Sequence, residues 1–210
     1  MPNLFFEALP QNTLKLLEKF QQSKPQFLKD FYLSGGTALS LLIGTRESED
    51  LDFFNFNDFD PIKLQTQLEN YGKLQNVELA EGTLNAYLDG VKLQFLRYPY
   101  KLIESVSTWN HLQISSKIDI ACTKLQTVSA RGSKKDFIDI YFLLQEFTLP
   151  LLFKKLKEKY PNSDYNQAHI LKSLTYFDDA LNQPMPKMHG LITWEQVQKE
   201  IVETVKDFKF

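Results

Sequence analysis

The chain has 210 residues, which suits one globular domain or a catalytic half followed by a helical half. Hydrophobic residues make up 43% of it, including 17 Phe, so a sizeable core can form. No apolar run approaches the ~20 residues that cross a bilayer, and the first residues lack the basic start of a secretory signal. We therefore expect a cytoplasmic protein without a membrane segment. The net charge of −2 excludes no anionic partner, because a local basic face can exist within a balanced total.

The single cysteine, Cys122, excludes an internal disulfide and most cysteine-based zinc sites. Its apolar neighbours Ile120 and Ala121 predict a buried thiol rather than a nucleophile. Lysines gather at Lys134-Lys135 and again in a run that we interpret as a solvated helix face. This run consists of Lys154, Lys155, Lys157 and Lys159.

The first half of the chain alternates helix-like and strand-like segments. In chain order they are a helix at 14–20, a strand at 31–33, a helix at 37–43 closed by Gly44, a strand at 51–56 and a helix opened by Asp60-Pro61. Short β segments follow at 77–80, 84–88 and 91–96. Asp89-Gly90 between the last two predicts a hairpin, because both turn positions tolerate positive φ.

The character changes after Pro99, where helical patterns take over. They cover 118–130, 135–147, 151–159, 168–177 and 194–208. We therefore predict an α+β fold with a mixed α/β core at 1–110 and a helical part at 111–210, with a soft boundary at about 100–115.

Asp50 and Asp52 are the first candidates for chemistry. On a strand, residues two apart share a face, with Cα atoms roughly 6.5–7 Å apart. Leu51 and Phe53 then point to the opposite side, into the core. Two carboxylates on one face of a buried strand repel each other, and a divalent cation removes that cost. Because Mg²⁺ takes one or two carboxylates together with phosphate oxygens, the pair suits a nucleoside-triphosphate site.

The turn Ser34-Gly35-Gly36 joins a predicted strand to a predicted helix that starts near Thr37. Such a turn offers backbone N–H groups and a helix N-terminus to a phosphate. It is equally consistent with a tight turn in which Ser34 caps the helix. The glycines alone do not separate these two interpretations.

The segment 124–139 combines charged groups with apolar helix faces. Lys124 and Arg131 lie seven residues apart, on one face of a helix. Ser133 can cap the next helix, with Asp136 completing an acidic capping box. Lys124 stands among apolar residues, so it either extends its stem to solvent or meets an anion.

Three stretches together resemble the AbiEii/AbiGii toxin family of nucleotidyltransferases. They are Leu33 to Leu39, Arg46 to Phe54, and the run from Lys124 through Arg131 to Asp139, in that order along the chain. The resemblance spans about residues 30–145 and implies a polymerase-β-like catalytic fold, a short mixed sheet flanked by helices, followed by a helical domain. It also implies nucleotidyl transfer from a nucleoside triphosphate with Mg²⁺ or Mn²⁺. Characterised relatives are toxins of toxin–antitoxin pairs linked to abortive infection and phage defence, and some modify tRNA ends, so RNA and an antitoxin protein are implied partners.

The resemblance also implies roles for individual residues. Asp50 and Asp52 would hold metal, Lys124 would face the phosphates, and Asp136 would assist at the acceptor or nucleotide side. Nucleotide-binding positions would be Ser34, Gly35, Gly36 and Thr37, with Arg131 and Lys135 as weaker candidates.

Two positions depart from the family pattern. Gly36 stands where many members place Ser, and the expected third carboxylate of the superfold is Gln94. An amide oxygen can ligate metal but brings no charge and no general base. An alternative is therefore a nucleotide-binding or partner-binding module with weak or lost catalysis. Another is a small-molecule nucleotidyltransferase similar to the aminoglycoside-modifying enzymes, whereas an RNA acceptor would require lysine-rich faces near Lys134 and Lys154.

Overall fold

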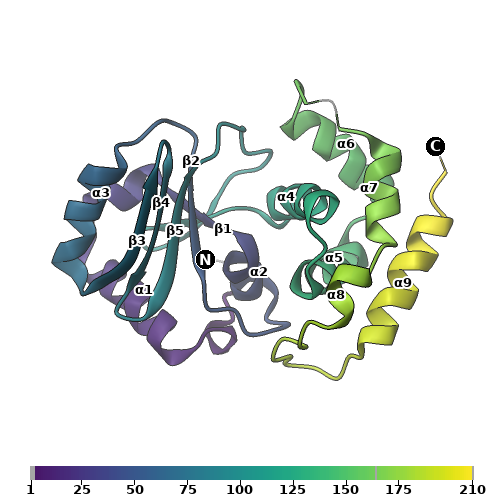
Figure 1. Ribbon diagram of the computed structural model, residues 1–210, viewed down its shortest axis with the longest axis horizontal. Coiled ribbons are helices and arrows are strands. Elements are labelled where there is room, and N and C mark those ends of the chain that lie inside the picture. Colours follow the sequence, from purple (N-terminus) through teal and green to yellow (C-terminus); the bar gives the residue numbers. More distant parts are fainter. Residues whose placement is uncertain (1–2, 164, 210) are drawn as a thin grey trace. The chain divides into compact units, whose positions relative to one another are not determined.

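The computed structural model describes residues 3–163 and 165–209, and its internal contacts divide the chain into two compact units. Unit 1 is Met1–Ser116 and unit 2 is Lys117–Phe210. Figure 1 shows the strands in unit 1 and helices alone in unit 2. Among the described residues, no helix has both the length and the apolar character needed to cross a membrane.

Unit 1 is built on a mixed seven-stranded sheet within the described residues, ordered β3-β4-β5-β2-β1-β7-β6. The strands are β1 (Tyr32–Ser34), β2 (Leu51–Asn55), β3 (Leu74–Ala80), β4 (Thr83–Leu88), β5 (Val91–Arg97), β6 (Ser107–Trp109) and β7 (Leu112–Ile114). Strand β2 pairs antiparallel with β1 and parallel with β5, so it lies near the middle of the sheet. The helices are α1 (Gln11–Ser23), α2 (Gly35–Ile43) and α3 (Pro61–Leu68).

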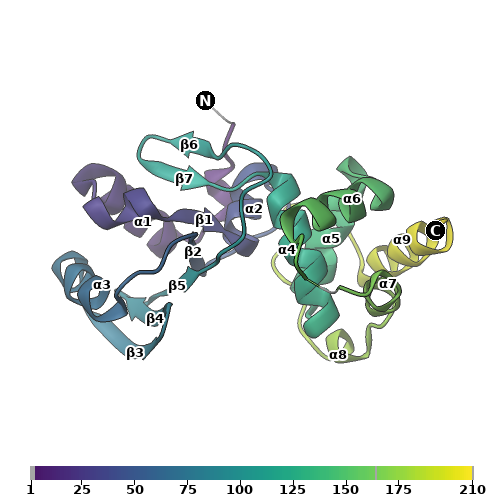
Figure 2. The ribbon, with the colours of Figure 1, turned by 90° about the horizontal axis from the view of Figure 1, so that it is seen from above.

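The two faces of this sheet differ in composition. Figures 1 and 2 show α1 and α3 on one face and α2 on the other. Side chains on the α1–α3 face are completely buried and apolar, including Leu33, Phe53 and Phe95, with Phe53 and Phe95 stacked at 4.9 Å between ring centroids. The alternating residues, which point to the α2 face, are partly exposed and polar along β4 and β5. One face therefore forms the core, and the other is the polar face.

Local chemistry explains the boundaries of the predicted elements in unit 1. Gly44 ends α2 in the left-handed conformation at φ 67°, and Asp60 caps α3 by accepting hydrogen bonds from the backbone N–H groups of Ile62 and Lys63. Asp89 and Gly90 form the expected turn with φ 49° and 82°. These predictions are confirmed.

Unit 2 packs its helices around α4. The helices are α4 (Lys117–Ala130), α5 (Lys134–Glu146), α6 (Leu149–Lys159), α7 (Gln167–Leu174), α8 (Asp178–Leu181) and α9 (Trp194–Lys206). Cys122 is buried, as predicted, and the Ser133 side chain accepts a hydrogen bond from the Asp136 backbone N–H as the cap of α5. The predicted fold class, with a sheet-containing core followed by helices, is confirmed.

The structure adds one element that was not predicted, divides the chain at a slightly different place and contradicts one expectation. The hairpin of β6 and β7 was not predicted, because each strand has only three residues and Asn110 at its turn is a weak signal. The two units meet at 116–117, whereas the division was expected at 110–111. Lys159 was wrongly assigned to a solvated face: it is 3% exposed and pairs with buried Asp119 at 2.6 Å, because its position on α6 faces α4.

Candidate functional site

The register of the sheet places Asp52 in a row of polar side chains. Asp52 is the partner of Ser34 on β1 and of Gln94 on β5, and Gln94 is the partner of Asn85 on β4. Directly paired residues on neighbouring strands point to the same face and lie about 5 Å apart. The four side chains therefore line one strip across the polar face of the sheet.

Gln94 occupies the position expected for a third carboxylate, and its amide has a defined orientation. Its Nε2 donates a hydrogen bond to Asn85 Oδ1 at 2.9 Å. Because the amide nitrogen is directed toward β4, the carbonyl oxygen of Gln94 is the group left for the Asp52 side of the row. Gln94 thus has an amide oxygen that this hydrogen bond leaves available, on the strand next to Asp52.

Asp50 precedes β2 and lies on the same face as Asp52. Lys92, on β5, approaches it with 3.7 Å between Nζ and Oδ2. Both side chains are nearly half exposed, so this ion pair is weak and easily exchanged for another cation.

The Gly35-Gly36 turn is closely surrounded by side chains. Gly35 has φ 67°, and a Cβ built on it would lie 2.3 Å from Asp52 Oδ2. The Asp52 carboxylate therefore stands against the first residue of α2, at the positive end of the helix dipole. A Cβ on Gly36 would lie 2.7 Å from Arg46 Nη2. Both glycines are required by these neighbours, whatever ligand approaches the turn.

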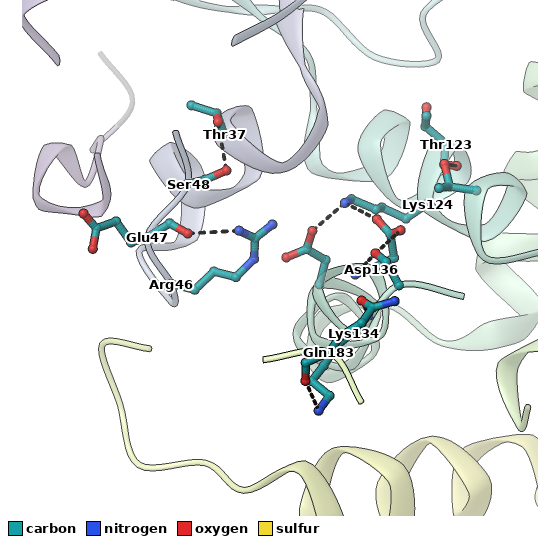
Figure 3. Close-up of polar contacts among 12 residues, drawn as sticks. Thr37, Arg46, Glu47, Ser48, Thr123, Lys124, Lys134, Asp136 and Gln183 are labelled. Carbon is teal, nitrogen blue, oxygen red and sulfur yellow. Dashed lines mark hydrogen bonds and ion pairs between the residues drawn. The ribbon is translucent and has the colours of Figure 1, made fainter. Parts of the chain in front are cut away.

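Ser34 and Thr37 are both buried. Ser34 is the N-cap residue of α2 by position, but its side chain makes no capping hydrogen bond and instead accepts one from Ser115 Oγ at 3.0 Å. Thr37 Oγ1 bonds to Ser48 Oγ at 2.9 Å and to the backbone oxygen of Asp50 (Figure 3). Thr37 therefore connects the first turn of α2 to the segment that carries the acids.

The donor set at this position fits a divalent cation shared with a phosphate ligand. In residues 3–163 and 165–209, no group of three or more His, Cys, Asp or Glu side chains is arranged to hold a metal. The available protein donors are the carboxylates of Asp50 and Asp52 and the amide oxygen of Gln94. Mg²⁺ keeps several waters and binds through one or two carboxylates plus phosphate oxygens, so this set suits it better than a closed protein cage would.

Unit 2 brings together two of the predicted site residues. Lys124 Nζ lies 2.7 Å from Asp136 Oδ1 and 2.6 Å from Asp139 Oδ2, and all three side chains are buried (Figure 3). Ser133 Oγ donates to Asp136 Oδ2 at 2.5 Å. Of the two possibilities left open for Lys124, it meets an anion. Its ammonium is held in a fixed position by two carboxylates of α5.

The other lysines and arginine of this segment differ in accessibility. Arg131 and Lys135 are exposed. Lys134 is 5% exposed, and its Nζ donates to the backbone oxygens of Leu181, at 3.2 Å, and Gln183, at 2.5 Å (Figure 3). Lys134 therefore stabilises unit 2 and is not part of a lysine-rich surface.

Three residues of these clusters were given no role from the sequence. Asp139 lies three residues after Asp136 on one helix, so helical spacing could have identified it. Asn85 could be found only from the strand register, and Arg46 only from the tertiary contact with Gly36.

Comparison with known proteins gives a consistent result. The model of the family described as nucleotidyl transferase AbiEii toxin, type IV toxin–antitoxin system, matches residues 16–114, which lie within unit 1. A relative from Aquifex aeolicus (strain VF5), named uncharacterized protein aq_aa25, is 38% identical over 185 residues, covering 85% of this chain and 88% of the relative.

Two solved structures share the fold. JHP933 from Helicobacter pylori is similar with a TM-score of 0.55 and 20% identity, over 97% of this chain and 92% of that one. MenT4, the nucleotidyltransferase toxin Rv2826c from Mycobacterium tuberculosis H37Rv, has a TM-score of 0.51 and 12% identity, over 95% and 87% of the two chains. At these identities the likeness establishes the fold alone.

Proposed function

Because the chain belongs to the AbiEii family of nucleotidyltransferase toxins, we propose that it transfers a nucleotidyl group from a nucleoside triphosphate to an acceptor hydroxyl. The observation that carries the proposal is the position of the Asp52 carboxylate. It stands against Gly35 at the start of α2, in one row with the oriented amide of Gln94. A carboxylate and a helix N-terminus are groups that suit a metal-bound triphosphate, and an amide oxygen is a further possible metal ligand.

In the proposed reaction the acceptor oxygen forms a bond to the α-phosphorus, the bond from that phosphorus to the leaving oxygen breaks, and pyrophosphate departs. Asp50 and Asp52 would hold Mg²⁺ or Mn²⁺, which neutralises phosphate charge when bound. The N–H groups at Gly35 and Gly36 would face the triphosphate. The family resemblance implies Lys124 and Asp136 as further site residues, and within unit 2 the Lys124 charge is balanced by Asp136 and Asp139. Gln94 cannot take up a proton, so the acceptor proton passes to solvent.

The test is transfer of label from each of the four α-labelled ribonucleoside triphosphates to total RNA in the presence of Mg²⁺. Asp50→Asn and Asp52→Asn should each lower transfer by at least about 100-fold, because each removes a charged metal ligand. Glu49→Gln is the matched control: it neutralises an exposed neighbouring carboxylate and should leave transfer unchanged. Wild-type transfer in either Asp variant would contradict the proposed metal role.

The family description also supports a role as the toxin of a toxin–antitoxin pair. We propose tRNA as the first acceptor to examine. Induced expression in a bacterial host should then slow growth, and Asp52→Asn should relieve the effect at equal protein level. Growth arrest that persists in the variant would assign toxicity to something other than transfer.

A second function is favoured by Gln94, since a neutral ligand holds metal less tightly than a carboxylate does. In this alternative the chain binds nucleotide, or a partner protein, without turnover. Mg²⁺-ATP or Mg²⁺-GTP would then raise the Tm while no labelled product forms.

A further inference from the structure

Arg46 follows α2 in the chain, and its buried side chain lies beside the first turn of that helix. It is 2% exposed and is among the largest side chains buried to this degree in the described part of the chain. Its Nη1 donates to the backbone oxygen of Glu47 at 3.0 Å (Figure 3), while a Cβ on Gly36 would lie 2.7 Å from Nη2 and 3.7 Å from Cζ. The guanidinium therefore packs directly on the backbone of Gly36.

Neighbouring contacts also connect the first turn of α2 to the segment that precedes β2 and carries Asp50. Ser48 Oγ would lie 3.3 Å from a Cβ on Gly36 and bonds to Thr37 Oγ1 at 2.9 Å. Thr37 Oγ1 also bonds to the backbone oxygen of Asp50, and Ser48 N–H donates to Ala8 O at 3.0 Å. The first turn of α2 and the segment 46–50 are thus fixed to each other on both sides of Gly36.

Burial of a guanidinium costs desolvation free energy, and an apolar side chain of similar volume is often as stabilising. A cation near the N-terminus of a helix also meets the positive end of the helix dipole. These two costs make the contact of Arg46 with Gly36 a feature to explain through its effect on the turn.

We infer that Arg46 is a positioning residue of the nucleotide site. By packing on Gly36 and bonding the strand-entry segment, it sets the distance between the Gly35-Gly36 turn and the Asp52 carboxylate, which stands against Gly35. The inference rests on the proposed function. If that function holds, the shape of the metal and triphosphate site depends on a side chain that touches neither ligand. Arg46 and Ser48 fill the space that a side chain on Gly36 would occupy.

A double-mutant cycle tests the contact itself. Gly36→Ala should lower the Tm by about 3–8 °C, because the new methyl group overlaps Nη2. In the Arg46→Met background the guanidinium is absent, and the same Gly36→Ala change should lower the Tm by less than half as much. Equal effects of Gly36→Ala in the two backgrounds would overturn the inference.

Binding of Mn²⁺, measured by the free-ion electron paramagnetic resonance signal, tests positioning. Arg46→Met removes a cation near the acids, so electrostatics alone would tighten Mn²⁺ binding; loss of positioning should instead weaken it about tenfold. Lys92→Met is the matched control, because it also removes one cation but from the exposed pair with Asp50. It should tighten binding about twofold at low salt.

Tighter Mn²⁺ binding in both variants would mean that Arg46 affects the metal only through its charge, and would overturn the inference. Failure of the proposed function has a different signature: the wild-type protein would transfer no label, while the Gly36–Arg46 coupling would persist in the Tm cycle.

Discussion

At the scale of single residues, the candidate site is defined by what surrounds each backbone position. Gly35 combines a left-handed backbone with contact to a carboxylate, whereas Gly90 has a left-handed backbone in open space and Gly190 has neither feature. The three glycines thus differ in backbone conformation and in the atoms around them. The chain therefore provides an internal series for separating backbone strain from loss of the site.

Substitution of these glycines by Ala should give a graded result. Gly190→Ala should be neutral, and Gly90→Ala should cost about 1–2 kcal/mol of unfolding free energy, because only φ is strained. Gly35→Ala should cost more and should also abolish Mn²⁺ binding, since its Cβ displaces Asp52. Chemical denaturation and Mn²⁺ titration measure the two effects, and intact Mn²⁺ binding in Gly35→Ala would contradict the assigned position of Asp52.

Gln94→Glu supplies the carboxylate that the superfold commonly has at this position. A third negative ligand should tighten Mn²⁺ binding on the order of tenfold. Asn85→Leu, which removes the acceptor for the Gln94 amide, should weaken it. If both variants bind Mn²⁺ as the wild type does, Gln94 does not face the metal.

Burial of the Cys122 thiol raises its pKa, so the unfolding free energy depends on pH. Desolvation is the largest cause that raises its pKa to about 12 from the ordinary value of 9.0; nearby Asp119 adds to the increase, and Lys159 opposes it. The native state therefore keeps its proton, so this group leaves stability unchanged below pH 9 and reduces it as the pH rises from 9.0 toward 12. Labelling by a disulfide reagent at pH 8 should be on the order of 100-fold slower in native buffer than in denaturant. Rapid native labelling would show that the thiol is accessible.

At the scale of elements, a helix cap can also contact side chains of the candidate site. The cap at Ser133 both starts α5 and bonds to the Asp136 carboxylate that holds Lys124. Thr148 caps α6 in the same way but has no link to that cluster.

Ser133→Ala and Thr148→Ala should each cost about 1 kcal/mol of unfolding free energy. Only Ser133→Ala should also lower nucleotidyl transfer, because it frees the Asp136 carboxylate. Equal activity in the two variants, measured by label transfer, would separate the Lys124 cluster from function.

At the scale of the whole molecule, each of the two units contains one of the two tryptophans, Trp109 in unit 1 and Trp194 in unit 2. Fluorescence of Trp109→Phe or Trp194→Phe proteins thus reports the unfolding of one unit at a time. Within unit 2, the Lys159–Asp119 pair is almost completely buried, so removal of Lys159 takes a buried counter-charge away from Asp119.

Lys159→Met should lower the unfolding free energy reported by Trp194 by about 3–5 kcal/mol. Lys199→Met, which breaks an exposed pair with Glu203 at 3.9 Å, should change it by about 0.5 kcal/mol or less. A small effect of Lys159→Met would mean that water or a neighbouring group satisfies Asp119 after the substitution.

The sequence by itself determined the α+β class, most elements to within a few residues and the Cys122 burial, and it predicted the Asp50–Asp52 pair as the metal-binding acids. These follow from local rules, because periodicity, turn residues and caps act over a few positions. Contacts between distant segments depended on tertiary structure alone. Strand register placed Gln94 and Asn85 beside Asp52, and packing placed Arg46 against Gly36. Helix packing likewise buried Lys159, a residue whose charge led to the expectation of a solvated face. The sequence therefore proposed the acids, and the fold decided what surrounds them, because register and packing depend on residues that no local pattern connects.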